Sequence, residues 1–514
     1  MPQPKWYHKS LAELCMDSIV DNMEKWTALR SSEHVSSLFY LLPSHCLEYM
    51  TECLLKDYSI TEDMFDLLFK SPHTKVLDLS QDYLGTGYDA NRNFRIVRLA
   101  SVRCLQLTTL KIHDGCCIAY CNDKRNSKLE ETFTSILQRF EHLQILDLSF
   151  TFYGAISMLN LGSTNQPKIR ELIVNYCPGV TDTVVKVFCN GQSSLQKLSV
   201  NGTEVTHSGI RYAIEHLPEL KELNCDNESD LKAFRRIRKE TRESKKYSLT
   251  KWLMWTKPDE VSYKKGSVSL MVDMCPSLVD VFIHVNDEGF TDEELLGFRK
   301  LKQIKNLGIR ISFLPSIISI PGGVIPLLQA RGLTIEELYL SVEVTSEEVY
   351  LIIQCCPNIR RLLLAMHFYL YTIPEPVLDY GVHSSLRSPK EVFPLKMLED
   401  ISLSSYYFRF PISRKLLLLL LSSPALTAVS IEKCFTLDDE IIEEVCARNS
   451  FKYLTKLKFH GCSNVSQKGI DFFLNEANPL DEISLKDCGN VNLERMRTMA
   501  QEKHWNSVKI TVED

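Results

Sequence analysis

The pattern of apolar positions along this chain repeats one short phrase from Thr74 onward. The phrase is an apolar residue, two others, an apolar residue, one other and an apolar residue, as in residues 143–148, 169–174 and 195–200. Its last apolar residue recurs at intervals of about 26 residues, and each copy predicts a short buried strand. Between copies, apolar residues three and four positions apart predict returning helices over residues 182–188, 208–216, 347–355 and 438–446.

A strand with its returning helix cannot bury its apolar face alone, so consecutive units must stack to build a core. This repeat is typical of leucine-rich repeats, and cysteines that follow several copies resemble the cysteine-containing subclass. We predict an α/β solenoid over residues 59–514, a horseshoe with parallel strands on the concave side and helices on the convex side. It should contain about 15–16 units. We expect a weak repeat near 249–254, a closing strand at Ile510 and a loop insertion near 371–396.

Residues 1–58 precede the repeats and carry a helical pattern, which predicts a small helical box. Ser10 and Glu13 form a capping-box pair, so a helix should begin at this point. On that helix, one apolar stripe is formed by residues three and four positions apart, namely Leu11, Leu14, Cys15 and Ile19. Such a stripe faces either the protein core or a partner.

A second helical pattern follows at Leu42 and Pro43. Proline suits the first position of a helix, because the N–H that it lacks has no partner there. The apolar residues behind it fall on one face of the expected helix, namely Cys46, Leu47, Met50, Cys53 and Leu54.

Composition narrows the possible partners. The chain has 514 residues, of which 44% are hydrophobic, and a formal net charge of −6 at pH 7. A mildly acidic protein does not favour phosphate backbones, so we predict no nucleic-acid partner. No segment approaches the roughly 20 apolar residues of a membrane span, and the start of the chain lacks a signal-peptide pattern, so we predict no membrane association. We interpret the basic excess in residues 231–265 as a solvated helix and loop.

The 17 cysteines are an odd number and lie within apolar patterns, which suits buried thiols in a reducing compartment. We therefore expect a cytoplasmic or nuclear location. His113, Cys116, Cys117 and Cys121 are close in sequence but lack a second ligand pair at zinc spacing, so we predict no metal site. We find no G-x-S-x-G sequence, phosphate-binding loop or H-E-x-x-H sequence, so we predict neither a cofactor nor an enzymatic activity.

The concave side of the sheet is then the main candidate for binding. Residues that flank the central apolar position of each strand point to this side, where neighbouring strands hold them rigidly. In the middle repeats these positions include Trp, Tyr and Arg, the residue types that dominate interface energetics. We predict substrate contacts by Trp255, Phe282, His284, Arg310 and Tyr339. Alternatively, the aromatic residues seal the sheet edge or pack beneath a loop.

The N-terminal box followed by leucine-rich repeats resembles the Zyg-eleven family of substrate receptors in cullin-2 RING ubiquitin ligases. The pattern Leu11-x3-Cys15-x3-Ile19 behind a serine is similar to the elongin-binding BC box. The resemblance implies that this stripe, with Leu14, binds elongin C, which pairs with elongin B. It also implies a cullin-2 box formed by Leu42, Pro43, Cys46, Leu47 and Met50. The horseshoe would then present a protein substrate.

One departure from the family limits what the resemblance implies. Family members carry armadillo repeats after the leucine-rich part, and those repeats are associated with recognition of N-terminal glycine degrons. Here the leucine-rich pattern continues to Ile510. We therefore expect the substrate surface on the horseshoe itself.

Two other interpretations stay open. An F-box receptor of the cullin-1 type also begins with Leu42-Pro43, although the first repeat strand at Val76 leaves little room for its three-helix domain. A leucine-rich scaffold outside any ligase would use its first helices to cap the apolar end of the solenoid. The cap interpretation buries the stripe that contains Leu11, whereas the elongin interpretation leaves it exposed until a partner covers it.

Overall fold

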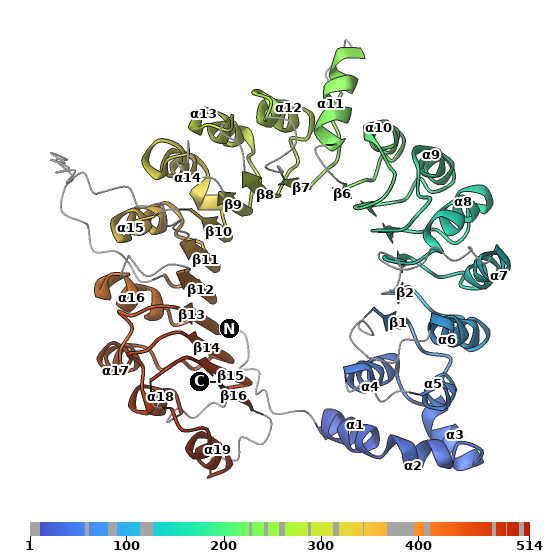
Figure 1. The fold of residues 1–514 in the computed structure, drawn as a ribbon, viewed down its shortest axis with the longest axis horizontal. Coiled ribbons are helices and arrows are strands. Elements are labelled where there is room, and N and C mark those ends of the chain that lie inside the picture. Colours follow the sequence, from blue (N-terminus) through green and yellow to red (C-terminus); the bar gives the residue numbers. More distant parts are fainter. Residues whose placement is uncertain are drawn as a thin grey trace. The chain divides into compact units, whose positions relative to one another are not determined.

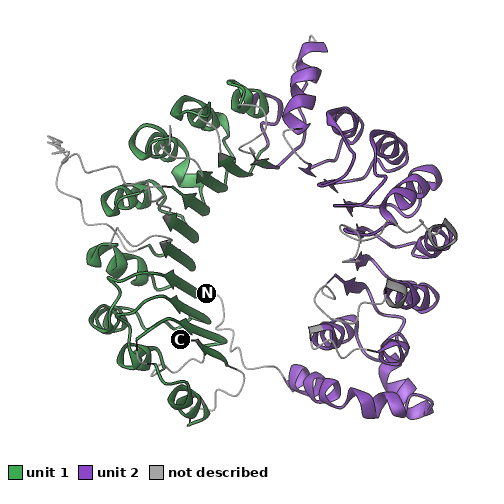
Figure 2. Cartoon of the chain, in the orientation of Figure 1, with its two compact units in different colours: residues 1–8, 253–272, 278–514 green, residues 9–252, 273–277 purple. Residues whose placement is uncertain are grey.

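The computed structural model describes residues 11–56, 61–80, 90–113, 127–225, 229–240, 245–255, 263–285, 289–311, 318–342, 344–366, 395–405, 412–474, 480–489, 491–502 and 508–513. These residues form sixteen strands that lie in one parallel sheet in sequence order, from β1 to β16 (Figure 1). This order confirms the α/β leucine-rich-repeat solenoid that the apolar pattern predicts. The chain divides into two compact units (Figure 2). Unit 2 extends to Trp252 and includes Asp273–Ser277, and unit 1 comprises Leu253–Val272 and Leu278–Asp514.

Unit 2 begins with helices and continues with alternating strands and helices. The helices before the first strand are α1 (Leu11–Asp21), α2 (Met23–Ala28), α3 (Glu33–Tyr40), α4 (Ser44–Lys56) and α5 (Glu62–Leu68). The strands that follow are β1 (Val76–Leu79), β2 (Thr109–Ile112), β3 (Ile145–Asp147), β4 (Glu171–Ile173), β5 (Lys197–Ser199) and β6 (Glu222–Asn224). Their helices are α6 (Ala90–Arg103), α7 (Ser127–Leu137), α8 (Gly154–Thr164), α9 (Asp182–Gly191), α10 (His207–His216) and α11 (Ser229–Glu240).

Unit 1 repeats the same alternation, and β7 (Lys251–Trp255) and α12 (Ser267–Met274) contribute residues to both units. Its strands are β8 (Asp280–Val285), β9 (Asn306–Ile311), β10 (Glu337–Ser341), β11 (Arg361–Met366), β12 (Asp400–Ser405), β13 (Ala428–Glu432), β14 (Lys456–His460), β15 (Glu482–Lys486) and β16 (Lys509–Glu513). Its helices are α13 (Asp292–Leu296), α14 (Ile325–Arg331), α15 (Ser346–Cys355), α16 (Arg414–Leu421), α17 (Asp439–Arg448), α18 (Gln467–Leu474) and α19 (Leu493–Glu502), with short turns η2 (Gly297–Lys300), η3 (Ile320–Val324) and η4 (Gly332–Thr334).

The strand register stacks equivalent apolar positions of successive repeats. Leu338 of β10 pairs with Leu307 of β9 on one side and with Leu362 of β11 on the other. All three side chains are buried. Burying a leucine of this kind stabilises the fold by about 1.5–3 kcal/mol, so the stacked positions form a continuous core along each unit. In each unit the helices lie on one side of the strands (Figure 1), and we call the other side the open face.

Several elements expected in the repeat region are present in the structure. The four predicted helices correspond to α9, α10, α15 and α17, the weak repeat forms β7, and the closing strand is β16. The predicted loop insertion falls almost entirely on residues 367–394, which lie outside the described residues. That residues 1–58 form a separate helical domain stays a prediction. The helical part before the first strand also includes α5, which lies beyond residue 58.

A carboxylate near the start of one helix is linked to the residue that caps the next helix. In α9, Asp182 accepts hydrogen bonds from the backbone N–H of Thr206 at 2.8 Å and from its hydroxyl at 2.6 Å. Gly209, three residues on, has no side chain to obstruct the carboxylate, since a Cβ there would lie 2.5 Å from Asp182 Oδ1. The same capping link joins Asp292 to Ser319 and Asp439 to Ser466.

Candidate interaction sites

Helix α1 is held against the rest of unit 2 by one side. Met16 is its buried side chain, at 6% exposure. Tyr49 of α4 donates a hydrogen bond from its hydroxyl to Asp17 Oδ1 at 2.7 Å. Burial, together with this bond to a carboxylate, raises the pKa of Tyr49, so the phenol stays protonated and the link persists at physiological pH. These contacts fix which face of α1 points outward.

The predicted elongin stripe lies on the outward face of α1. The helix begins at Leu11, as the sequence predicts, while its predicted cap Ser10 lies outside the described residues. Leu11 is 78% exposed and Leu14 is 53% exposed. Cys15 is exposed as a free thiol, and Ile19 is half-buried. The exposure that the elongin interpretation expects is therefore present at Leu11, Leu14 and Cys15, whereas the cap interpretation expects these side chains to be buried.

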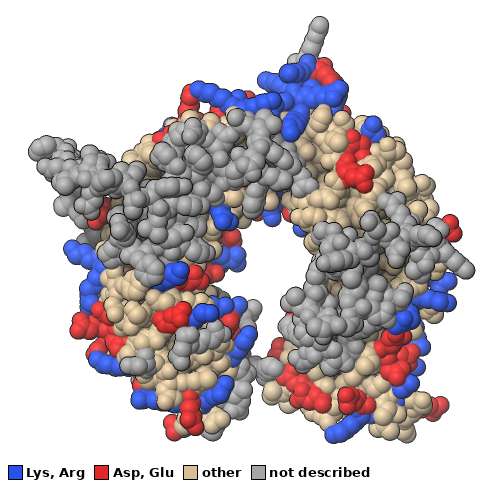
Figure 3. All heavy atoms as spheres, viewed as in Figure 1, with Lys and Arg blue, Asp and Glu red and all other residues tan. Residues whose placement is uncertain are grey.

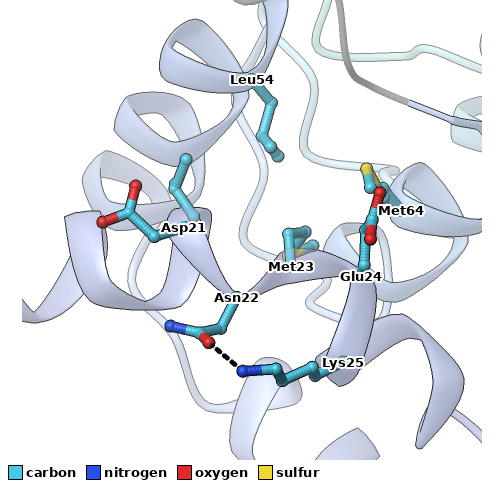
Figure 4. Close-up of a pocket in the computed structure, with 8 residues that line it drawn as sticks. Asp21, Asn22, Met23, Glu24, Lys25, Leu54 and Met64 are labelled. Atoms are coloured by element: carbon cyan, nitrogen blue, oxygen red, sulfur yellow. Dashed lines mark hydrogen bonds between the residues drawn. The ribbon is translucent and has the colours of Figure 1, made fainter.

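A pocket of about 340 Å³ lies where α1 passes into α2 (Figure 4). Its apolar lining comes from Met23 of α2, Leu54 of α4 and Met64 of α5. Lys25 donates a hydrogen bond to Asn22 Oδ1 at 2.8 Å on the rim, which fixes the turn between the helices. The pocket therefore adjoins the C-terminal end of the helix that carries the stripe.

The predicted cullin box is only partly available at the surface. Pro43 is exposed and Leu42 is half-buried, but Cys46, Leu47 and Met50 are buried. Burial also raises the pKa of the Cys46 thiol. In this structure the apolar face of α4 is packed within unit 2, and a cullin contact by these three side chains stays a prediction.

A different apolar surface lies just before α4. Leu38 of α3 is 56% exposed and Leu41, directly after that helix, is 73% exposed. Val35 and Phe39 are the buried residues of α3. The sequence carries a signal for the exposed surface, since Leu38 and Leu41 are three residues apart and can lie side by side on a helix surface. Leu38 and Leu41 are absent from the residues predicted above, because no separate helix was expected over residues 33–41.

The predicted substrate residues lie on the open face of β7 to β10. Phe282, Gly308 and Tyr339 are register partners on three neighbouring strands. The Phe282 ring lies directly over Gly308, where a Cβ would come within 2.2 Å of it, and it is 5.4 Å from the Tyr339 ring between centroids. Both aromatic side chains are half-buried. Trp255 lies in β7, but its side chain is outside the described residues.

The next row of the same face contains His284, Arg310 and Ser341, again as register partners. Burial, with a smaller effect from the Arg310 charge, lowers the pKa of His284 to about 4, so its imidazole is neutral at physiological pH. Arg310 is half-buried and Ser341 is fully buried. Within the described part of the chain, Arg310 Nε and Ser341 Oγ are buried without a hydrogen-bond partner. The structure thus brings four of the five predicted substrate residues into one cluster.

The predicted solvated helix in the basic stretch is α11. Phe234 and Ile237 are among its buried residues, while Lys and Arg side chains gather over its outer surface (Figure 3). Arg236 and Arg211 both pair with Glu240, at 3.1 and 2.6 Å. Exposed pairs of this kind contribute little stability, so α11 is explained by its apolar face.

The described residues contain no cluster that could hold a metal ion. His113 Nε2 lies 3.2 Å from Asp147 Oδ2, and Cys116, Cys117 and Cys121 lie outside the described residues. Burial works to raise the pKa of Asp147, but the nearby His113 imidazole and the hydrogen bonds from Ser149 outweigh it and hold that pKa below its usual value. Over the same described part of the chain, no helix is both long and apolar enough to cross a bilayer.

No family model and no curated protein matches this sequence. Among solved structures, a chain of the yeast Rad7 and Elc1 complex shares 14% identity over 70% of this chain and 93% of that chain, with a TM-score of 0.37. The leucine-rich-repeat proteins LegL7 of Legionella pneumophila and LIC12759 of Leptospira interrogans share 13% identity each. They cover 57% and 88% of this chain, and 83% and 92% of their own, with TM-scores of 0.32 and 0.35. Because these scores are low, the fold assignment rests on the strand order and register.

Proposed function

We propose that this chain is a non-catalytic substrate-recognition subunit of a cullin-2 ubiquitin ligase. Helix α1 binds elongin C, which pairs with elongin B, and the leucine-rich repeats hold the protein substrate. The observation that carries the proposal is the outward apolar stripe of α1, with Leu11 78% exposed. An exposed leucine next to a small exposed cysteine has the form of a helix that inserts into an apolar pocket.

The cullin is selected by the surface around the end of α3. Leu41 and Pro43 are exposed there, and Leu38 lies one turn before them. In this assignment Leu42 and Pro43 of the predicted cullin box still contribute to the surface. The exposed leucines Leu38 and Leu41 take the role that the sequence had assigned to the buried residues of α4. The interior residues Cys46, Leu47 and Met50 then support the helix that carries this surface.

The test is a binding measurement between the purified full chain and elongin B/C, with and without cullin-2. The variant is Leu11→Ala, Cys15→Ala, which removes two anchors of the stripe. We expect loss of about 2–5 kcal/mol of binding free energy, enough to abolish a micromolar complex. Because both side chains are exposed, the midpoint of unfolding in denaturant should stay unchanged.

The matched control is Leu333→Ala, which truncates a leucine that is 71% exposed in η4 of unit 1. It should bind elongin B/C as the wild type does. If the wild type fails to bind, or if the double variant binds equally well, the ligase proposal is wrong and the chain acts as another kind of leucine-rich interaction protein.

A further inference from the structure

The open face of β8, β9 and β10 carries an aromatic platform. The platform consists of the Phe282 ring, which covers Gly308, and the Tyr339 ring beside it. Glycine is required beneath the ring, because a Cβ at position 308 would clash with it at 2.2 Å. The two half-buried rings, whose planes are tilted by 39°, present an apolar surface on which another side chain can pack.

Arg310 lies two residues along β9 from the centre of this platform. No ion pair or hydrogen bond of its guanidinium occurs among the described residues, and its Nε is buried without a partner. Two other basic side chains on this face are paired: Arg361 lies 3.1 Å from Glu337, and Lys458 lies 3.1 Å from Glu482. Arg310, in contrast, is a positive charge without an acidic partner among the residues that the structure describes.

The neighbours of Arg310 do not neutralise it. His284 is neutral at physiological pH, since burial lowers its pKa, and Ser341 offers a buried hydroxyl without a partner. Buried donors of this kind are costly to leave unsatisfied, and a guanidinium pairs best with a carboxylate. Within the described ranges, the row therefore offers Arg310 no anionic acceptor.

The spacing of the platform and the charge fits an extended chain. Two residues along a strand span about 6.6 Å, which is also the distance between side chains two positions apart on the same side of an extended peptide. An extended segment that runs alongside β9 can therefore place one side chain on the rings, and the side chain two positions further along can reach Arg310. Because the sheet already holds the three strands rigidly, this side of the complex loses little conformational entropy when the segment binds.

We propose that this cluster binds an extended protein segment in which an apolar residue and an acidic residue stand two positions apart. The apolar side chain packs on Phe282 and Tyr339, and the side-chain carboxylate pairs with Arg310. This inference rests on the proposed function, in which the repeats hold a protein substrate, and it names the chemistry of that substrate.

The experiment measures binding of fluorescent heptapeptide pools to the purified full chain by anisotropy, without any ligase component. The test pools are acetylated at the N-terminus and amidated at the C-terminus. Each peptide contains Leu or Phe, then any residue, then Asp or Glu, and a parallel pool has this order reversed. A second set replaces the acid with Asn or Gln, and a third has no acidic side chain but a free C-terminus. We expect the capped acidic pools to bind about tenfold or more tightly than the two other sets.

The variant is Arg310→Gln, and the control is Arg361→Gln, which removes an arginine on the neighbouring strand that is already paired. Arg310→Gln should remove the preference for the acidic pools, whereas Arg361→Gln should retain it. Both should keep wild-type binding to elongin B/C, which separates a failure of this inference from a failure of the ligase proposal. Preference for a free C-terminus, equal binding of acid and amide pools, or an unchanged Arg310→Gln variant would each overturn the proposal.

Discussion

His284 and Arg310 are register partners on neighbouring strands, so each alters the other's electrostatics. His284 is 5% exposed, and burial beside a cation lowers the pKa of its imidazole to about 4. In the unfolded chain the imidazole takes up a proton near its ordinary value of 6.5, whereas in the folded chain it does so only near 4. Between these values the unfolded state binds more protons, so the folded state loses stability as pH falls.

We therefore expect His284→Asn to weaken this pH dependence. Through this residue, the free energy of unfolding of the wild type falls by about 1.4 kcal/mol for each pH unit below 6.5. From pH 6.5 to about pH 5 the loss is about 2 kcal/mol. The measurement is the free energy of unfolding in denaturant for both proteins at several pH values. The difference between the two curves should appear below pH 6.5 and not above it; parallel curves would contradict the assignment.

At this scale the sequence predicted the candidate residues better than their roles. Strand spacing placed His284, Arg310 and Tyr339 on one face, because alternation along a strand is strict. The sequence could not show that Arg310 has no acidic partner in the described part of the chain, since ion pairing between strands depends on which repeats are neighbours. Nor could it show that Phe282 covers Gly308, which depends on a side-chain rotamer.

Helix α4 illustrates what periodicity can and cannot establish at the level of an element. The apolar stripe behind Pro43 was predicted, and α4 does form from Ser44 to Lys56. Periodicity identifies residues that share a face but does not say whether that face meets the core or a partner. For α1 the stripe is outward, and for α4 it is inward, because α1 packs through Met16 instead.

The burial of α4 gives a stability prediction. Met50→Ala should lower the free energy of unfolding by about 2–5 kcal/mol, because it leaves a cavity where a side chain with no exposed surface was packed. Leu41→Ala, a few residues earlier and 73% exposed, should change it by less than about 0.5 kcal/mol. Chemical denaturation of the two variants checks the contrast. A silent Met50→Ala would return this residue to the candidate cullin surface.

Across the whole molecule, stability is built from contacts between neighbouring repeats. Phe459 of β14 pairs in register with Ile431 of β13 and with Leu485 of β15, and all three are buried. The sequence predicted this architecture because the same apolar pattern recurs many times, so an ambiguous strand or helix assignment in one copy is resolved by the other copies. It could not predict that the chain divides into two compact units near Trp252, since the weak repeat at β7 still forms a strand.

The stacking of repeats predicts a local response to a core substitution in unit 1. Phe459→Ala should cost about 3–5 kcal/mol and accelerate amide hydrogen exchange in β13, β14 and β15. Exchange in β3 to β5 of unit 2 should be unchanged, since each repeat is stabilised chiefly by its neighbours. Exchange mass spectrometry of the full chain measures both regions at once. Phe459→Leu, which removes less volume than the alanine variant, should give a smaller effect. A uniform acceleration of exchange across both units would show that the destabilisation is not confined to neighbouring repeats.

The capping links between consecutive helices bear on how an array of this kind can change over generations. The carboxylate of Asp439 and the serine that donates to it, Ser466, both occupy fixed places within the repeating unit. Duplication or loss of a complete unit therefore gives every carboxylate a new neighbour with matching donors. The link itself spans 24 residues between Asp182 and Thr206 but 27 residues between Asp439 and Ser466, so a unit can change length and still bring donor and acceptor together. The array can therefore change by whole repeats, and its units can differ in length, while this link is kept.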